Sequence, residues 1–525
     1  MKSLLDLSHY EEIQTSFHRE RLWDLFDGNR TQLNLAHECI DRHVTKGIAI
    51  NVKHEDGKLE KLEYGELRRT TGQFANWLCA KQIAKGDVVA IILEPGKAFY
   101  TGVFGTIKRG AIAVPLFTLF GPEGLALRID DCKPKLLLVD KGADEIRAQF
   151  PEIIVQEIGG DFWSQLSRES DDYRPDSKAD DLCVLQYTSG TTRALPEAVR
   201  HTQRSVVTLM IAALYGTGLR PDDRFFCPSS PAWGHGLWHG TIAALALGIE
   251  IGTYSGKFEA VRIFEALEEL KVDNFAAAAT VFRLLRNSGL RSDYDINLKK
   301  CTFTGEPMDP ATFDWVLDAL GLSPGSMYGT TEVGVIIVDY PGVKGYAIRK
   351  GALGKPAPGN EVTVLKDTGA IANTDEIGEL AVKRKGTWFR VKDFGRIDKD
   401  GYFYHAGRSD DVIISAGWTM SAVEIENTLL KHPAVGEAAV IGVPDELRGQ
   451  IARAFVVLRN DESVSGEELQ NYMKERLSLH EYPREIEFLS DLPKTPAGKV
   501  NRKGLRDAVR QGNNLLMNKS GKNDE

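Results

Sequence analysis

The chain has 525 residues and a formal net charge of −9 at pH 7, which argues against a nucleic-acid partner and gives no reason to expect attraction to an acidic membrane surface. Its length is too great for one hydrophobic core, so two or three domains are expected. The six cysteines are scattered without a CxxC pair, and the sequence has neither an export signal nor an apolar run of 18 residues. These features predict a cytoplasmic protein with reduced thiols and no membrane span.

The first part of the chain alternates between buried strands and helices. Strands are expected at 88–93, 111–116 and 135–140, with helices at 97–110 and 123–132 between them. Continuous apolar strands separated by helices are typical of a parallel sheet that is covered on both faces. The sequence therefore predicts an α/β fold with doubly wound sheets in a large N-terminal region.

A helix over 259–272 carries an apolar stripe that fits the same architecture. Short strands at 361–365 and 379–383 beside a Gly/Pro-rich segment then indicate a β subdomain, and a new helix and strands after Arg408 indicate a small α+β domain. The expected division is an N-terminal domain at 1–408 with the β subdomain at about 340–408, a C-terminal domain at 409–510, and a tail at 511–525 that is expected to be disordered.

A loop of small hydroxyl-bearing residues follows the apolar run 182–185. It contains Tyr187, Thr188, Ser189, Gly190, Thr191 and Thr192. Backbone N–H groups and hydroxyls of such a loop can surround phosphate oxygens, because no bulky side chain blocks the approach. The nucleotide-loop pattern Gly-x-x-x-x-Gly-Lys-Ser/Thr is absent, so a P-loop NTPase is disfavoured.

Three further motifs follow this loop in order. They are Tyr328-Gly329-Thr330-Thr331-Glu332, Gly407-Arg408-Ser409-Asp410-Asp411 and Pro493-Lys494-Thr495-Pro496-Ala497-Gly498-Lys499. Together the four motifs resemble the core signatures of the adenylate-forming superfamily, which contains acyl-CoA synthetases, adenylation domains and luciferases. The resemblance covers almost the whole chain, and it is nearest to the short- to medium-chain and aromatic acyl-CoA synthetases.

The resemblance implies a nucleotide site. Its expected members are Thr188, Ser189, Gly190, Thr191, Thr192, Gly305, Glu306, Pro307, Tyr328, Gly329, Thr330, Asp393 and Arg408. Within this set, Tyr328 would stack on adenine and Asp393 would accept both ribose hydroxyls, a task for an ionised two-oxygen acceptor. Thr331 would contact the α-phosphate, and Glu332 would hold the Mg²⁺ that accompanies ATP.

The resemblance also implies two alternating conformations. Lys499 would be the catalytic cation of the first step, where one ammonium bridges the attacking carboxylate and the α-phosphate. Asp410 would be the hinge about which a mobile C-terminal domain turns. The segment Ser415, Ala416 and Gly417 would then line the tunnel for the pantetheine arm of CoA.

The acyl pocket is expected around Trp233, Gly234, His235 and Leu237, with Gly329 beside it. These segments offer aromatic and small surfaces without a carboxylate, which disfavours an amino-acid substrate because its ammonium would need a partner. His235 is interpreted as a pocket wall or a structural histidine. Acetate-specific relatives carry a Trp where this chain has Gly329, so room for a medium-chain, branched, alicyclic or aromatic acid is expected.

Two segments depart from the family pattern. Glu197 stands where a phosphate-loop lysine is expected, and a glutamate would repel leaving pyrophosphate, so Arg193 or Arg200 is the candidate source of positive charge. Val391-Lys392 replaces the usual Thr-Gly ahead of Asp393.

The predicted function is an AMP-forming carboxylic acid:CoA ligase with Mg²⁺, ATP and CoA. A carrier-protein thiol as acceptor and a non-catalytic nucleotide-binding relative remain alternatives, and a homo-oligomer is left open.

Overall fold

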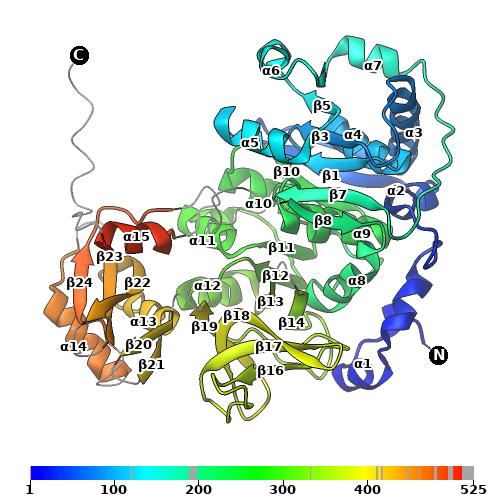
Figure 1. The fold of residues 1–525 in the computed structure, drawn as a ribbon. Helices are drawn as coiled ribbons and strands as arrows, with labels where there is room; N and C mark the ends of the chain where they lie inside the picture. Colours follow the sequence, from blue (N-terminus) through cyan, green and yellow to red (C-terminus); the bar gives the residue numbers. More distant parts are fainter. Residues whose placement is uncertain are drawn as a thin grey trace, which may run out of the picture.

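The computed structural model describes residues 2–118, 120, 122–187, 198–330, 333–408, 412–415, 418–445, 449–459, 462–477, 482–494 and 500–510. It confirms the predicted α/β class. In this part of the chain, helices pack on two large sheets, and two smaller sheets follow along the chain (Figure 1). The N-terminal residues form short helices: η1 (Leu4–Asp6), α1 (Tyr10–Ser16), η2 (Arg19–Leu25), α2 (Leu35–Cys39) and η3 (Asp41–His43).

The first large sheet has the strand order β6-β5-β3-β4-β7-β8. Its strands are β3 (Val88–Ile92), β4 (Ile112–Pro115), β5 (Leu136–Val139), β6 (Ile154–Glu157), β7 (Leu182–Tyr187) and β8 (Ala198–Thr202). All pairs are parallel except β7 with β8. The connecting helices are α3 (Tyr64–Ala80), α4 (Lys97–Arg109), α5 (Pro122–Cys132), α6 (Ala143–Gln149) and α7 (Gly160–Leu166). The strands and helices predicted between 88 and 140 all appear, because their apolar runs are buried on both faces of this sheet.

The second large sheet has the order β15-β14-β13-β12-β11-β9-β10-β1-β2. Its strands are β1 (Ile48–His54), β2 (Leu59–Glu63), β9 (Phe225–Phe226), β10 (Ile251–Ser255), β11 (Asn274–Ala278), β12 (Lys300–Thr304), β13 (Gly325–Thr330), β14 (Gly334–Val338) and β15 (Lys355–Pro356). The run from β1 to β13 is parallel, and antiparallel strands close both edges. The carboxyl ends of the parallel strands therefore meet at one edge, where ligands of open α/β sheets bind.

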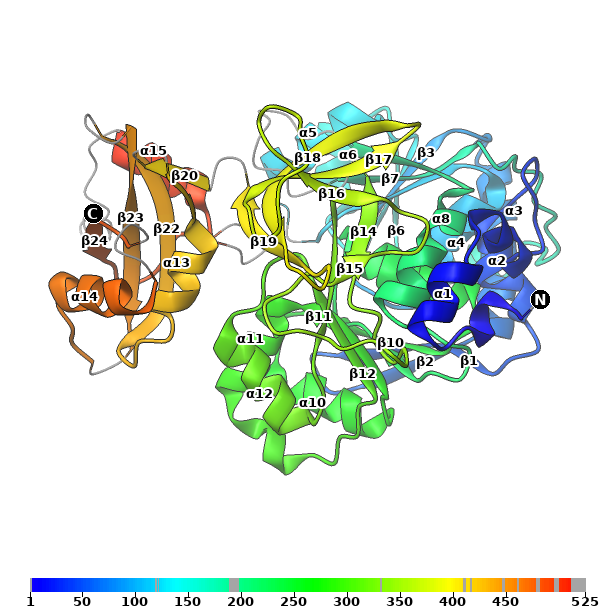
Figure 2. The same ribbon diagram turned by 90° about the horizontal axis from the view of Figure 1, so that it is seen from below.

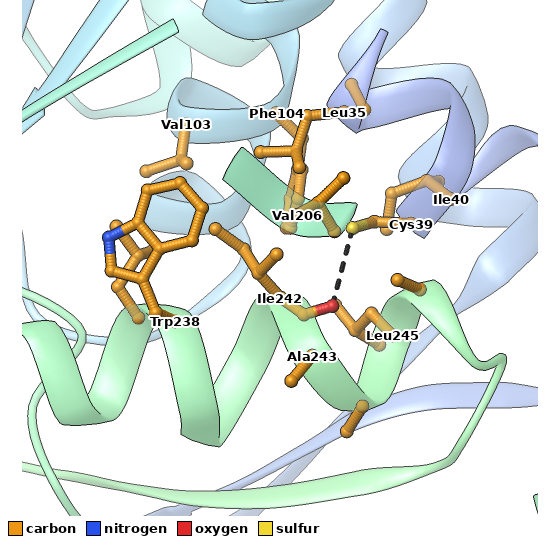
Figure 3. Packing of buried hydrophobic residues seen from close by; sticks show 14 of the residues in the cluster. Leu35, Cys39, Ile40, Val103, Phe104, Val206, Trp238, Ile242, Ala243 and Leu245 are labelled. Atoms are coloured by element: carbon orange, nitrogen blue, oxygen red, sulfur yellow. Dashed lines mark hydrogen bonds between the residues drawn. The ribbon is translucent and has the colours of Figure 1, made fainter. Parts of the chain in front are cut away.

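The helices that accompany this sheet are α8 (Ser205–Ile211), the π-helical segments η4 (Ala212–Gly216) and η5 (His235–Ile242), α9 (Ala243–Ala246), α10 (Ala260–Glu269), α11 (Ala279–Ser288), η6 (Leu290–Asp293) and α12 (Pro310–Leu320). The predicted helix at 259–272 is α10. Figure 3 shows how η5 is fixed: Trp238 and Ile242 pack with Val103, Phe104 and Val206 in the main core. The thiol of Cys39 also donates a hydrogen bond to the carbonyl oxygen of Ile242 at 3.7 Å.

The two remaining sheets use only residues after 361. An antiparallel sheet contains β16 (Val362–Leu365), β17 (Gly378–Arg384), β18 (Thr387–Ile397) and β19 (Phe403–Arg408). The last sheet contains β20 (Val412–Ser415), β21 (Trp418–Ser421), β22 (Val435–Asp445), β23 (Gly449–Leu458) and β24 (Glu485–Phe488), with α13 (Ala422–Leu429), α14 (Gly466–Arg476) and α15 (Arg502–Arg510). Both views place this last body to one side of the molecule, beyond β19 (Figures 1 and 2). We propose that it is the separate C-terminal domain expected at 409–510.

Candidate nucleotide and acyl site

The carboxyl ends of β11, β12 and β13 bring the two predicted segments 305–307 and 328–330 together with Thr280. The hydroxyl of Thr280, just after β11, donates a hydrogen bond to Glu306, which follows β12. The hydroxyl of Thr304 donates to the carbonyl oxygen of Met327 at 2.8 Å and so ties β12 to β13. The segment Gly305-Glu306-Pro307 therefore lies beside the strand that carries Tyr328.

A single hydrogen bond joins two of the predicted nucleotide residues that are 65 positions apart. The hydroxyl of Tyr328 on β13 donates to Oδ2 of Asp393 on β18 at 2.6 Å. Asp393 is 8% exposed, and its direct partner across the β18–β19 pair is Arg408. The fold thus gathers the aromatic, the carboxylate and the backbone of the arginine at the junction between the large sheet and the β16–β19 sheet.

Gly329 lies close to the main chain of β14. A Cβ built on this residue would overlap the carbonyl oxygen of Gly334 and lie 2.7 Å from Cα of Val335. Only glycine therefore fits at this position beside β14, and the place of Gly329 next to the acyl pocket stays a prediction. Its neighbour Thr330 has a buried hydroxyl with no hydrogen-bond partner in the described part of the chain.

Lys392, directly before Asp393, has φ 65°. This left-handed conformation is uncommon for a residue with a side chain, and the family pattern has glycine at this position. The Lys392 amide donates to Oε1 of Glu379 at 3.0 Å. The sequence analysis noted Lys392 but did not identify Glu379. The signal that could have pointed to such a contact is the lysine at a position where the family pattern has glycine, because a non-glycine residue there needs a partner that holds its backbone.

The predicted acyl segment divides into buried and accessible residues. His235 is buried at the start of η5, with Nδ1 2.9 Å from Oγ of Ser229. Leu237 is fully buried in the main core, and its assignment as a pocket-lining residue stays a prediction. Trp233 and Gly234 remain partly exposed, so they are the members of this segment that can face a substrate.

Three imidazoles around η5 have lowered pKa values. Burial lowers the pKa of His235 to about 3, with a further contribution from nearby His239. Burial also lowers the pKa of His239 to about 4 and that of His201 to about 4. His201 packs against Trp238 with 4.3 Å between ring centroids. These rings are neutral at pH 7, so the described wall of the acyl end carries no histidine charge.

Several predicted residues lie outside the described ranges. They are Thr188, Ser189, Gly190, Thr191, Thr192, Arg193, Glu197, Thr331, Glu332, Asp410, Ala416, Gly417 and Lys499. Ser415 is described as the end of β20, and Arg200 is exposed on β8 opposite Leu185. No group of three His, Cys, Asp or Glu side chains that could hold a metal occurs in the described residues. No helix among them is long and apolar enough to cross a membrane.

Comparison with known proteins decides the family. The family model described as AMP-binding enzyme matches residues 39–388, and the model of its C-terminal domain matches residues 424–499. The chain belongs to the AMP-binding enzyme family. The predicted membership of the adenylate-forming superfamily is thereby confirmed, and the first match spans most of the two large sheets.

The relatives of this AMP-binding enzyme support a ligase. An uncharacterized acyl-CoA ligase of Bacillus subtilis, YtcI, is 31% identical over 91% of this chain and 97% of its own length. The crystal structure of an acyl-CoA synthetase from Brucella canis is 31% identical, covers 96% of this chain and 100% of its own, and has a TM-score of 0.74. The crystal structure of the anthranilate CoA ligase AuaEII in complex with anthranoyl-AMP is 26% identical in sequence. It covers 93% of this chain and 99% of its own, with a TM-score of 0.82. The predicted assignment as an AMP-forming acid–CoA ligase is therefore confirmed at the level of the enzyme class.

Proposed function

We propose that this enzyme activates a carboxylic acid with ATP and transfers the acyl group to CoA in two steps. The observation that carries the proposal is the hydrogen bond between Tyr328 and Asp393. It joins an aromatic ring suited to adenine and a carboxylate suited to ribose hydroxyls, beside the unpartnered hydroxyl of Thr330. The family membership of the chain supports the same nucleotide.

In the first step, an oxygen of the acid attacks the α-phosphorus of ATP and pyrophosphate leaves. Two anions approach each other in this step, so positive charge is needed where they meet. We assign that charge to Lys499 and a contact with the α-phosphate to Thr331. Glu332 would hold Mg²⁺, which as a hard cation neutralises phosphate oxygens when it is bound.

In the second step, the sulfur of CoA attacks the acyl carbon and AMP leaves. The proposed C-terminal domain would turn about Asp410 between the steps, which withdraws Lys499 and presents Ser415, Ala416 and Gly417 to the pantetheine arm. Such domain alternation lets one active site serve two reactions that need different groups.

We propose that the acid is medium-chain, branched, alicyclic or aromatic. The support is the neutral character of the η5 wall and the partly exposed indole of Trp233, because an apolar pocket gains about 0.8 kcal/mol for each CH₂ that it buries. The anthranilate CoA ligase among the similar structures acts on an aromatic acid.

The test is AMP release by the full chain with ATP, Mg²⁺ and a panel of acetate, hexanoate, cyclohexanecarboxylate, benzoate and anthranilate, each with and without CoA. CoA-dependent AMP release that is greatest for one of the larger acids is expected. Release that prefers acetate would contradict the acid class. Acid-dependent pyrophosphate exchange without transfer to CoA would contradict the acceptor and favour a carrier-protein thiol. The variant Asp393→Ala is the negative control.

A further inference from the structure

The strand that carries Asp393 is interrupted immediately before this residue. In the β17–β18 pair, Ala381 lies opposite Arg390 and Glu379 lies opposite Phe394. One residue of β17 therefore faces the three residues 391–393 of β18, which form a bulge. Bulges of this kind re-aim side chains and occur often beside active sites.

The left-handed backbone of Lys392 lies at the centre of this bulge. For a residue with a Cβ, this conformation costs roughly 1–2 kcal/mol, an amount that corresponds to a factor of about 5–30 in an equilibrium. The conformation persists only where its surroundings enforce it. If Lys392 adopted a negative φ instead, the backbone after it would change direction. The side chain of Asp393 would then lose its hydrogen bond with Tyr328.

Glu379 supplies the contact that enforces the conformation. Its Oε1 accepts the Lys392 amide at 3.0 Å, and its Oε2 accepts from the guanidinium of Arg390 at 2.7 Å. Arg390 is held in turn, because it also donates to the carbonyl oxygen of Lys366 at 2.7 Å. The Glu379 side chain is 15% exposed, so the carboxylate has little freedom to turn away from the bulge.

We propose that Glu379 is a positioning residue for nucleotide binding. Its carboxylate, oriented by Arg390, holds Lys392 in the left-handed conformation and thereby presents Asp393 to the ribose. The proposal rests on the proposed function in one respect, which is the role of Asp393 as the acceptor of ribose hydroxyls.

The experiment measures equilibrium binding of ATP to the full chain by calorimetry, which needs neither the acid nor CoA. Glu379→Ala should weaken ATP binding by about 5–30-fold, because the apparent dissociation constant rises as the competent fraction falls. In the Lys392→Gly background the same substitution should have an effect of less than about threefold, since glycine adopts positive φ without a steric cost.

A matched control is available in the same strand pair. Lys385, in the turn between β17 and β18, also has a positive φ of 48°. Glu379→Ala combined with Lys385→Gly should lose as much affinity as Glu379→Ala alone, because relief of strain at this turn does not move Asp393. Rescue by Lys385→Gly would overturn the proposal.

A second ligand separates positioning from general damage. Binding of 2′,3′-dideoxy-ATP, which lacks both ribose hydroxyls, should change by less than about threefold on Glu379→Ala, because Asp393 then has no partner to lose. An equal loss for ATP and its dideoxy analogue, or a loss that Lys392→Gly does not diminish, would overturn the proposal. If Glu379→Ala does not fold, Glu379→Leu serves in the same cycle, because leucine retains most of the side-chain volume but cannot accept the Lys392 amide. Unchanged ATP affinity in the variant that folds would overturn the proposal as well. A chain that fails to ligate any acid but shows this binding pattern would contradict the ligase function alone.

Discussion

The two ends of the candidate site are built from opposite kinds of contact. The nucleotide end relies on hydrogen bonds to carboxylates, such as Tyr328 with Asp393 and Thr280 with Glu306. The predicted acyl end lies around η5, where the imidazoles are neutral and a hydrophobic core packs. A site built on hydrogen bonds discriminates by orders of magnitude in kcat/KM against a ligand that lacks one of the hydrogen-bonding groups. An apolar pocket distinguishes ligands that differ by one methylene by only about 1–3 kcal/mol. The enzyme should therefore be strict toward the nucleotide and permissive toward the acid.

Removal of the ammonium group that we propose as catalytic, that of Lys499, should impair the reaction at the nucleotide end most severely. Lys499→Ala should slow adenylate formation by about 10²–10³-fold, which is typical for the loss of one contact to transition-state charge. The transfer of a supplied acyl-adenylate to CoA should be retained, because the proposed second conformation withdraws this lysine. Pyrophosphate exchange measures the first step and thioester formation measures the second. An equal loss in both steps would contradict the role in one conformation.

The hydroxyl of Tyr328 offers a finer test of the same end. Tyr328→Phe should raise the KM for ATP by about 10–100-fold, because a hydrogen bond to a charged group contributes about 1.5–3 kcal/mol. Tyr404→Phe is the matched control, since its hydroxyl donates to Asp398 at 3.2 Å on the same small sheet. Initial rates over a range of ATP concentrations measure the effect. The comparison fails if both variants have the same KM.

A substitution at Gly329 tests whether a side chain fits beside the main chain of β14. Gly329→Ala should lower the free energy of unfolding by about 1–3 kcal/mol, because the new Cβ meets the main chain of β14. The helical Gly65 has no atom within 4 Å of an added Cβ, so Gly65→Ala should cost nothing. Urea unfolding of the two variants measures the difference. An equally stable Gly329→Ala would contradict this expectation and would mean that β14 moves away from an added Cβ without cost.

The sequence was sufficient to predict the α/β class and several of the helices and strands. Apolar runs at 88–93 and 135–140 and the helix at 259–272 are local signals, and each became the predicted strand or helix. The contact of Glu379 with Lys392 could not be predicted, because it depends on the register of two paired strands. The blocked side of Gly329 and the burial of Leu237 likewise depend on which segments pack against them. The motifs thus suggested candidate residues, and tertiary packing decided what each described residue can contact.

The acyl end should reveal its neutral character through the pH dependence of stability. Burial lowers the folded-state pKa of His235 to about 3, whereas the pKa of a histidine in the unfolded chain is about 6.5. Between these pH values the unfolded chain binds a proton at residue 235 that the folded chain does not bind. The contribution of His235 to the free energy of unfolding is therefore fully present above about pH 6.5 and decreases as the pH falls. The slope from this group is about 1.4 kcal/mol per pH unit. His235→Gln should therefore flatten the dependence between pH 6.5 and 5 by about that slope, while the two proteins should run parallel between pH 7.5 and 8.5. Urea unfolding across this range measures both slopes. An unchanged slope below pH 6.5 would show that His235 takes up a proton in the folded enzyme, and the acyl end would then offer a cation to its substrate instead of a neutral wall.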